Sequence, residues 1–327
     1  MLALLLLVAS IDANAQRRKK KARPKARTQM AVPAAAETAE TSMVSDKPMK
    51  LPTGVKAFEE TITSETDGPK KPIGKINWTV QYIEATGTGI LDNDRFKIPA
   101  QARAMAIRGA VVVAQRNLLE IVKGVHVQGE TTVEDMMTIK DIIVTRIEGI
   151  VKGAELVGAP IERGDGSVEV RLRMPLYAQN GLAPVVYDGM ETPQLIDDGN
   201  MSPIVDSGVT NTRKADEAPG TEKGIAFNLN GKPFDPTLFP IVKDEDGNVM
   251  LDFKQLYNPK DGKFPQYVKA TKEAMQRMGL KKGVEILDVL DMDKGTIKIS
   301  NASKSKFPWD KIINTAKTVG KFLLMLI

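Results

Sequence analysis

The chain has 327 residues, enough for two domains of ordinary size, and 42% of them are hydrophobic, enough to form a buried core. It contains no cysteine, which excludes disulfides, thiolate metal sites, a cysteine nucleophile and a lipid-modified N-terminal cysteine. The formal net charge is +5, from 46 basic and 41 acidic side chains.

The first residues have the pattern of a secretory signal peptide. An apolar run from Leu2 to Ala9 is followed by Ala13-Asn14-Ala15, a small-x-small site that predicts cleavage before Gln16. The run is too short to span a bilayer, and it lacks the basic residues that usually precede such a run. We therefore expect an exported, periplasmic protein, with outer-membrane association left open; the alternative is an apolar N-terminus without structure.

A basic segment follows at residues 16–27 and accounts for the positive charge. Without residues 1–15 and this segment, 38 basic and 40 acidic side chains remain, a net charge of −2. Because the remainder has no excess of basic residues, we expect no nucleic-acid binding. The segment is predicted to contact anionic lipid, lipopolysaccharide or wall polymer, or else to be a solvated tail without a partner. Its basic residues are Arg17, Arg18, Lys19, Lys20, Lys21, Arg23, Lys25 and Arg27.

The next segment, up to residue 72, is rich in Ala, Thr, Glu, Pro and Ser and has no hydrophobic period. It is predicted to be an extended or disordered tether, so that 16–72 lies outside the folded part. Alternation then predicts a strand that ends at a turn formed by Gly87-Thr88-Gly89. The alternating apolar residues are Ile76, Trp78, Val80 and Tyr82.

A long helix is predicted from Pro99, which suits a first helical turn, to a stop at Gly124. Its apolar stripe is predicted to pack on a sheet and to mediate assembly; the stripe comprises Ile107, Val111, Ala114, Leu118 and Val122. Small residues beside it would let another backbone approach closely, namely Ala102, Ala106, Gly109 and Ala110.

Three further elements complete a first domain at 73–185. Residues 125–127 are predicted to form a short strand, and Thr131 with Glu134 has the spacing of a capping box that opens a second helix through Ile150. A strand over 139–147 is the alternative, because that segment is rich in β-branched residues. A hairpin then turns at Gly164-Asp165-Gly166. The prediction is an α+β domain with a small antiparallel sheet and helices on one face.

A linker at 186–221 is predicted to lead to a second, β-rich domain at 222–302. It begins with a strand at residue 225, continues with two short strands around an acidic turn, a helix at 266–278 and a hairpin at 284–299. An amphipathic helix at 303–327 would end the chain and pack on its own domain, in a partner's groove or on a membrane surface. Its apolar residues are Ile312, Ala316, Val319, Leu323 and Leu326.

Sequence motifs for catalysis are absent, so we expect no enzyme, no cofactor and no metal site. The single histidine, His126, has no nucleophile at a recognisable spacing and is interpreted as structural. Asp244-Glu245-Asp246-Gly247-Asn248 resembles the start of a calcium loop, but Val249 stands where that loop needs glycine, and a hairpin turn explains the same residues. A catalytic pair among the many carboxylates stays open as a third alternative.

The run PAQARAMAIRGAVVVAQRNLLEIVKGVHV, the helix after TTVED and the strand VEVRLRMPL resemble the LPP-twenty-type lipoprotein family and related domains of the flagellar proteins FlgP and FlgT. The resemblance covers residues 76–180 and, loosely, 222–300. It implies a non-catalytic envelope protein, and some relatives form rings around the flagellar motor. This chain departs from the family in lacking a lipobox cysteine.

The sequence therefore predicts a homo-oligomeric envelope protein that scaffolds an assembly, with flagellar, gliding and general envelope roles all left open. Its partners would be envelope proteins or the outer-membrane or peptidoglycan surface. The alternative is a binding module for wall polymer, lipopolysaccharide or a small ligand.

Overall fold

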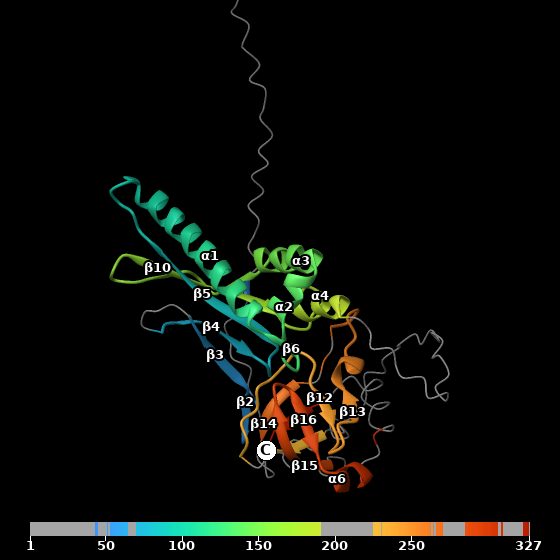
Figure 1. Ribbon diagram of the computed structural model, residues 1–327. Helices are drawn as coiled ribbons and strands as arrows, with labels where there is room; N and C mark the ends of the chain where they lie inside the picture. The colour runs from blue at the N-terminus through green and yellow to red at the C-terminus, as the bar shows by residue number, and fades with distance from the viewer. Residues whose placement is uncertain are drawn as a thin grey trace, which may run out of the picture. The chain divides into compact units, whose positions relative to one another are not determined.

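The computed structural model is a mixed α+β fold, as the sequence predicts (Figure 1). All the described residues belong to one compact unit, Thr41–Ile327. They are residues 43–44, 51, 53–64, 70–190, 225–229, 231–262, 264, 266–270, 285–306, 309 and 323–326.

The first sheet has the strand order β1-β8-β10-β5-β4-β3, with β9 paired to β10, and all its pairs are antiparallel except β1 with β8. Its central strands are β5 (Tyr82–Ile90) and β10 (Ser167–Pro175), which pair along their full length. The other strands are β1 (Met43–Val44), β3 (Glu59–Thr63), β4 (Pro72–Asn77), β8 (Glu155–Val157) and β9 (Ile161–Glu162).

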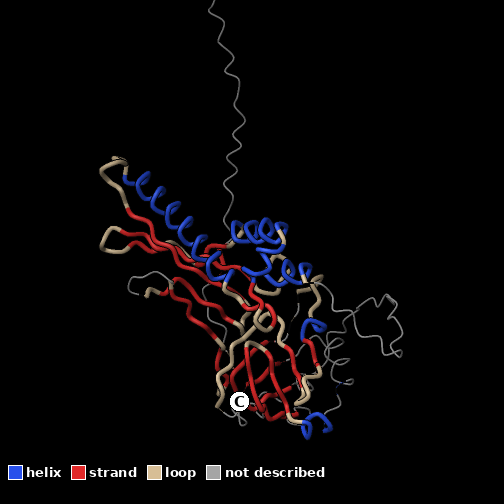
Figure 2. The backbone as a smooth tube through the Cα atoms, in the orientation of Figure 1, coloured by secondary structure: helices blue, strands red, loops and turns tan. Residues whose placement is uncertain are grey.

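Helix α1 (Pro99–Lys123) lies along β5 and β10, and Figure 2 shows it following both strands to their far ends. The short strands β6 (His126–Gln128) and β7 (Thr131–Thr132) then pair with each other. Helices α2 (Val133–Ile139), α3 (Asp141–Lys152) and α4 (Leu182–Gly189) contact one another beside α1.

The second sheet has the order β13-β12-β16-β15-β11-β17-β14-β2 and mixes parallel and antiparallel pairs. Its strands are β2 (Val55–Ala57), β11 (Ile225–Asn228), β12 (Ile241–Lys243), β13 (Val249–Asp252), β14 (Gln266–Ala270), β15 (Glu285–Asp293), β16 (Thr296–Ile299) and β17 (Leu323–Leu326). A 3₁₀ turn, η1 (Phe253–Leu256), and helix α6 (Asn301–Lys306) complete the described elements.

One hydrophobic cluster joins the two sheets, with Ile83, Leu118 and Ile147 from the first part and Phe239 and Tyr267 from the second. The segment 237–239 bonds directly to the first part. The Leu238 and Phe239 amides donate to the His126 and Val127 carbonyls at 2.9 Å, and the Tyr177 hydroxyl donates to the Leu238 carbonyl at 2.8 Å. The segments predicted as two domains thus share a core.

The ends of α1 agree with the prediction, because Pro99 lies in its first turn and Gly124 caps its end. The hairpins β9–β10, β12–β13 and β15–β16 also form where predicted. The second helix is broken at Lys140, whose extended backbone separates α2 from α3, and its capping box is Thr132 with Asp135, one residue from the predicted pair. Residues 141–147 are helical, so the strand alternative is wrong there.

Three predictions about strands and turns are wrong. Residues 55–57 and 59–63, assigned to the tether, form β2 and β3, and Phe58 between them is buried. The predicted strand from Ile76 to Tyr82 is interrupted by a turn at residues 78–81, where Gln81 has φ 66°. Gly87 and Gly89, predicted as a turn, lie within β5.

In the C-terminal part, residues 266–270 form β14 where a helix was predicted, because they pair with β2 and β17. Leu323 and Leu326, predicted on a terminal helix, lie in β17, which pairs with β11 and β14. Residues 303–306 of that predicted helix lie in α6, whereas Ile312, Ala316 and Val319 lie outside the described residues.

Candidate functional site

The distal part of the first sheet forms an arm, which we define as residues 86–114 and 160–171. The pairing of β4 with β5 ends at Ala85, and β8 pairs only with Leu172 and Arg173 of β10. Beyond these points only β5, β10 and β9 continue, covered by the first half of α1. The arm is therefore three strands and a helix.

The helix and the sheet of the arm approach each other unusually closely. α1 buries Ala102, Ala106, Ala110 and Ala114, one residue per helical turn. A Cβ atom on Gly87 would lie 2.1 Å from the Ala110 carbonyl oxygen, and one on Gly89 would lie 2.0 Å from that of Ala106. Because neither glycine has a side chain, the helix backbone rests on the strand backbone.

The predicted stripe of α1 is therefore only partly correct. Ala114, Leu118 and Val122 are buried, but Ile107 and Val111 are half-buried at the edge of a small cluster with Leu156, Val170 and Leu172. Of the small residues predicted as a flank for close approach, Ala102, Ala106 and Ala110 form the buried face in the first half of the helix, whereas Gly109 is exposed. This buried face contacts a strand of the same chain.

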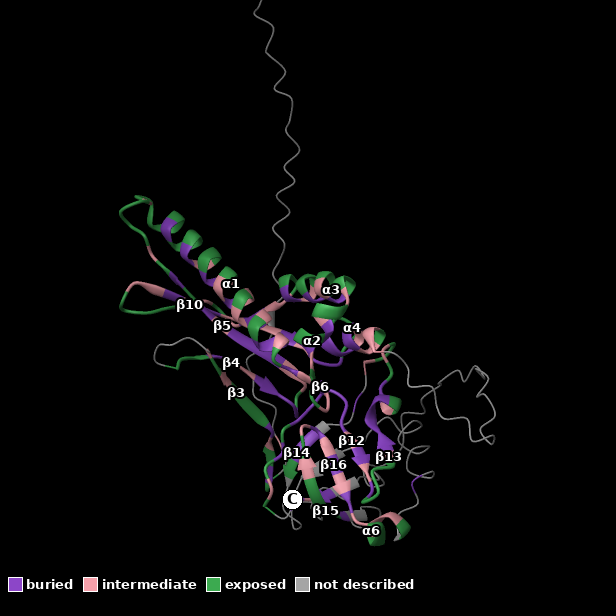
Figure 3. Ribbon diagram, in the orientation of Figure 1, coloured by how far each residue is buried: buried purple, intermediate pink, exposed green. Residues whose placement is uncertain are grey.

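Exposed apolar side chains gather on the arm. Among the described residues, ten large hydrophobic side chains are exposed, and five of them lie on the arm: Ile90, Ile98, Met105, Val112 and Ile161. Figure 3 shows the exposed outer side of α1 and of the loop at its beginning. Single exposed apolar residues are normal, but their concentration on one extension is typical of a protein contact surface.

These residues lie on both sides of the arm. Ile90 pairs with Ser167 and Ile161 with Glu169, on the face of the sheet opposite to Gly89 and therefore away from α1. Met105 and Val112 lie on the solvent side of the helix.

The charges of the arm are balanced, with six basic and five acidic side chains over its two segments. Several are paired: Arg103 bonds Glu162 across α1 and β9, and the Arg163 Nε atom donates to Glu169 at 3.1 Å. A balanced surface neither attracts an anionic polymer strongly nor repels another copy of itself.

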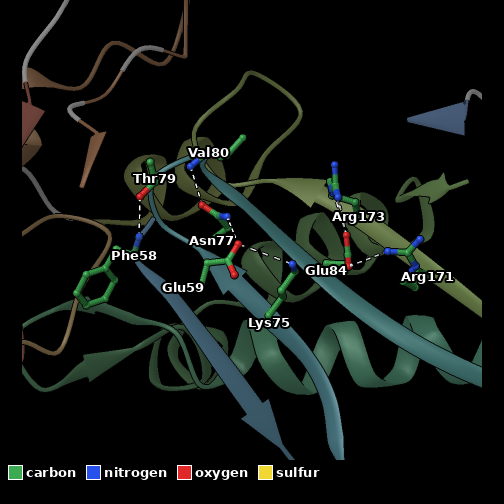
Figure 4. A network of polar contacts seen from close by, with 9 residues as sticks. All are labelled: Phe58, Glu59, Lys75, Asn77, Thr79, Val80, Glu84, Arg171 and Arg173. Carbon is green, nitrogen blue, oxygen red and sulfur yellow. Dashed lines mark hydrogen bonds and ion pairs between the residues drawn. The ribbon is translucent and has the colours of Figure 1, made fainter. Parts of the chain in front are cut away.

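At the base of the arm, the sheet face away from α1 carries an ion-pair network (Figure 4). Arg173 donates from Nε and Nη2 to one Glu84 oxygen at 3.1 and 2.7 Å, and the Arg171 Nη1 atom lies 3.8 Å from the other oxygen. The Arg173 guanidinium also lies over the Tyr82 ring, 4.0 Å from its centre. Because Glu84 and Arg173 are directly opposite on β5 and β10, the pair fixes the register of the strands on which the arm is built.

A second set of contacts in Figure 4 holds the turn at 78–81. The buried Thr79 hydroxyl accepts from the Phe58 amide at 2.8 Å and donates to the Tyr267 carbonyl at 2.5 Å. The Val80 amide donates to Asn77 at 2.7 Å, and Asn77 in turn donates to Glu59. These groups satisfy one another, which makes the network structural.

The other predicted site residues fall in different places. The basic residues between Arg17 and Arg27 lie outside the described residues. His126 lies on β6 at the wall of a cavity, and its Nδ1 atom is buried without a hydrogen-bond partner among the described residues. Asp244 closes the β12–β13 turn, as the hairpin interpretation predicts: it accepts from the Asn248 amide at 2.8 Å and from Lys304 at 2.7 Å.

Within the described part of the chain, no three His, Asp or Glu side chains are placed to hold a metal ion. No described helix is both long and apolar enough to cross a bilayer. A scan against protein-family models and a search of curated proteins found no match for this chain.

Proposed function

We propose that this protein is a non-catalytic structural component that self-associates through the arm. The observation that carries the proposal is the concentration on the arm of half the large exposed hydrophobic side chains among the described residues. The buried helix face of the arm consists of alanines, so the packing within the arm leaves its large apolar side chains exposed. Its exposed isoleucines supply the apolar area that an interface requires.

A second copy of the chain is the partner that the arm fits best. Six basic and five acidic side chains leave almost no net charge, so two arms meet without repulsion. The apolar residues on opposite sides of the arm favour a contact in which each copy uses two different surfaces. Such heterologous contacts close into rings where the rotation allows it.

The proposed setting is the bacterial envelope. The leader-like N-terminus supports export, and the LPP-twenty-type pattern supports a periplasmic assembly at the outer membrane, including one linked to the flagellar motor. The arm supports only the proposed self-association. The proposed location in the envelope is supported by the N-terminal pattern and the family resemblance.

The test compares two isoleucines that are equally exposed. Ile90, on the arm, is 76% exposed, and Ile139, at the end of α2, is 75% exposed. We expect the chain starting at Gln16 to form oligomers in light scattering coupled to gel filtration. Ile90→Ser should shift it toward the monomer, with Ile139→Ser behaving like the wild type.

A wild-type chain that stays monomeric at high concentration would refute the proposal. Equal effects of the two substitutions would remove the arm as the contact surface. Thermal unfolding of both variants separates lost association from lost folding, because neither side chain is part of the core.

A further inference from the structure

A cavity of about 640 Å³ lies between the two sheets, remote from the arm. Its wall is formed by β3, β4, the end of α1 with the start of β6, Glu134 of α2, the loop at 235–236 and the turn between β15 and β16. This volume is in the range of small-molecule sites in proteins. Six separate segments of the chain therefore converge on one partly open space.

The floor of the cavity is apolar. Ile76, Trp78, Ile121 and Val125 line it and are each at most 3% exposed, and Ile62 of β3 lies beside them. These side chains belong to the main hydrophobic cluster, so the floor is held rigidly. A ligand with an aliphatic body would find packing surface here.

The rim of the cavity is acidic. Four carboxylates line it against two lysines. Lys123 pairs with Glu134 at 3.2 Å, and Lys294 pairs with Glu130, which does not line the cavity.

The other three rim carboxylates, Glu60, Glu120 and Asp235, form no ion pair with any described residue. The rim therefore has negative charge that its own lysines leave uncompensated.

Two carboxylates of the rim lie close enough to repel each other. Desolvation raises the pKa of Glu60 above its usual value, and the nearby negative charge of Asp235 adds to this effect, although the Trp78 indole, which donates to Glu60 at 3.5 Å, and the nearby His126 lower it. A bound cation with N–H groups would stabilise both carboxylates.

We propose that this cavity binds an organic ammonium ion with a short aliphatic body. The ammonium lies between Glu60 and Asp235, and the aliphatic part packs on Ile62, Ile76 and Ile121. A bare metal ion does not fit, because no described group of three His, Asp or Glu is arranged for coordination. The site is independent of self-association through the arm.

The experiment uses three probes of equal length that differ in charge: hexylammonium, hexanoate and 1-hexanol, titrated into the chain at neutral pH and followed by amide NMR. Hexylammonium should bind and shift amides of β3, β4 and β6. Hexanoate should bind at least tenfold more weakly, roughly one step of 1.4 kcal/mol.

The variants Glu60→Gln and Asp235→Asn keep the shape of the side chains and remove one charge each. Each should weaken hexylammonium binding by roughly tenfold. Glu148→Gln is the matched control, since Glu148 lies on α3 outside the cavity and pairs with Lys152. It should bind like the wild type.

Four results would overturn the proposal. They are no binding of hexylammonium, equal binding of hexanoate, unchanged binding by both charge-removing variants, and equal binding of 1-hexanol, because in that last case the ammonium would contribute nothing. Both variants keep the side-chain volume and are expected to fold. Their amide spectra recorded without probe distinguish a loss of binding from a loss of folding.

Discussion

The close contact between α1 and β5 gives the sharpest prediction about stability. In Gly87→Ala the new methyl carbon would lie 2.1 Å from the Ala110 carbonyl oxygen and 2.3 Å from the Ala114 amide nitrogen. Ordinary contacts begin at 3.4 Å, so the helix backbone must retreat by about 1.3 Å (3.4 minus 2.1). Both obstructing atoms belong to the backbone, so rotation of a side chain cannot relieve the clash.

The cost follows from this displacement. Overpacking a well-packed core costs about 1–3 kcal/mol, and lifting the helix also loosens the buried methyl groups of Ala106, Ala110 and Ala114, worth about 0.8 kcal/mol each when fully buried. We expect Gly87→Ala to lower the free energy of unfolding by about 3 kcal/mol. Urea unfolding followed by circular dichroism measures it, and hydrogen exchange should accelerate in the first half of α1.

Gly149→Ala is the matched control for the same change of side chain. Gly149 is on α3 and exposed, and apart from its chain neighbours and the backbone of its own helix no atom lies within 4 Å of the place that the new methyl carbon would take. Alanine should therefore stabilise the helix by up to about 1 kcal/mol. The two substitutions should thus have opposite signs. A Gly87→Ala variant as stable as the wild type would refute the backbone contact.

Three further predictions concern polar groups. Glu84→Gln should lower the free energy of unfolding by about 1–2 kcal/mol, because Arg173 is 17% exposed and loses its charged partner. Thr79→Val nearly keeps the shape of the side chain but should lower the free energy of unfolding in urea by about 2 kcal/mol. The reason is that it leaves the Phe58 amide and the Tyr267 carbonyl without their hydrogen bonds to the hydroxyl. Hydrogen bonds from Lys304 and Asn248 hold the pKa of Asp244 well below its ordinary 3.8, so its contribution is present at neutral pH and is lost as pH falls below that value. Asp244→Asn should therefore be less stable than the wild type at pH 7, and the difference should shrink in acid unfolding profiles.

Each of these predictions has a clear contrary result. Unchanged stability of Glu84→Gln would mean that the ion pair only balances its desolvation. A Thr79→Val variant as stable as the wild type would mean that water or a shifted backbone satisfies both groups. An Asp244→Asn difference that stays constant from pH 7 into acid would show that the carboxylate charge contributes nothing.

The elements that local chemistry defines could be predicted from the sequence. Pro99 and Gly124 determine the ends of α1 through their own backbone preferences, and alternation with turn residues predicts the β9–β10 hairpin. Strand β3 has one aliphatic residue, Ile62, in a sequence of polar ones, and forms only because β4 pairs with it. Strands β14 and β17 also depend on partners far along the chain.

The buried face of α1 could have been predicted from two patterns together. Hydrophobicity ranks Ile107 and Val111 above alanine, which favoured the wrong stripe for the first half of the helix. Alanines at every fourth residue match a strand with glycines at alternate positions, here Gly87 and Gly89, because only this combination lets two backbones touch. The cavity had no such pattern, since its wall comes from six segments that only the tertiary fold brings together.

The arm separates stability from association in a way that substitutions can measure. Small residues hold α1 against β5, so the contact depends on shape and involves little apolar area. The large apolar residues, Ile90 among them, lie outside this contact and are free for a second chain. Gly87→Ala should therefore lower the free energy of unfolding, whereas Ile90→Ser should leave it nearly unchanged and reduce association. If the two properties always changed together across such variants, association and folding would use the same contacts, and the arm would be a part of the core.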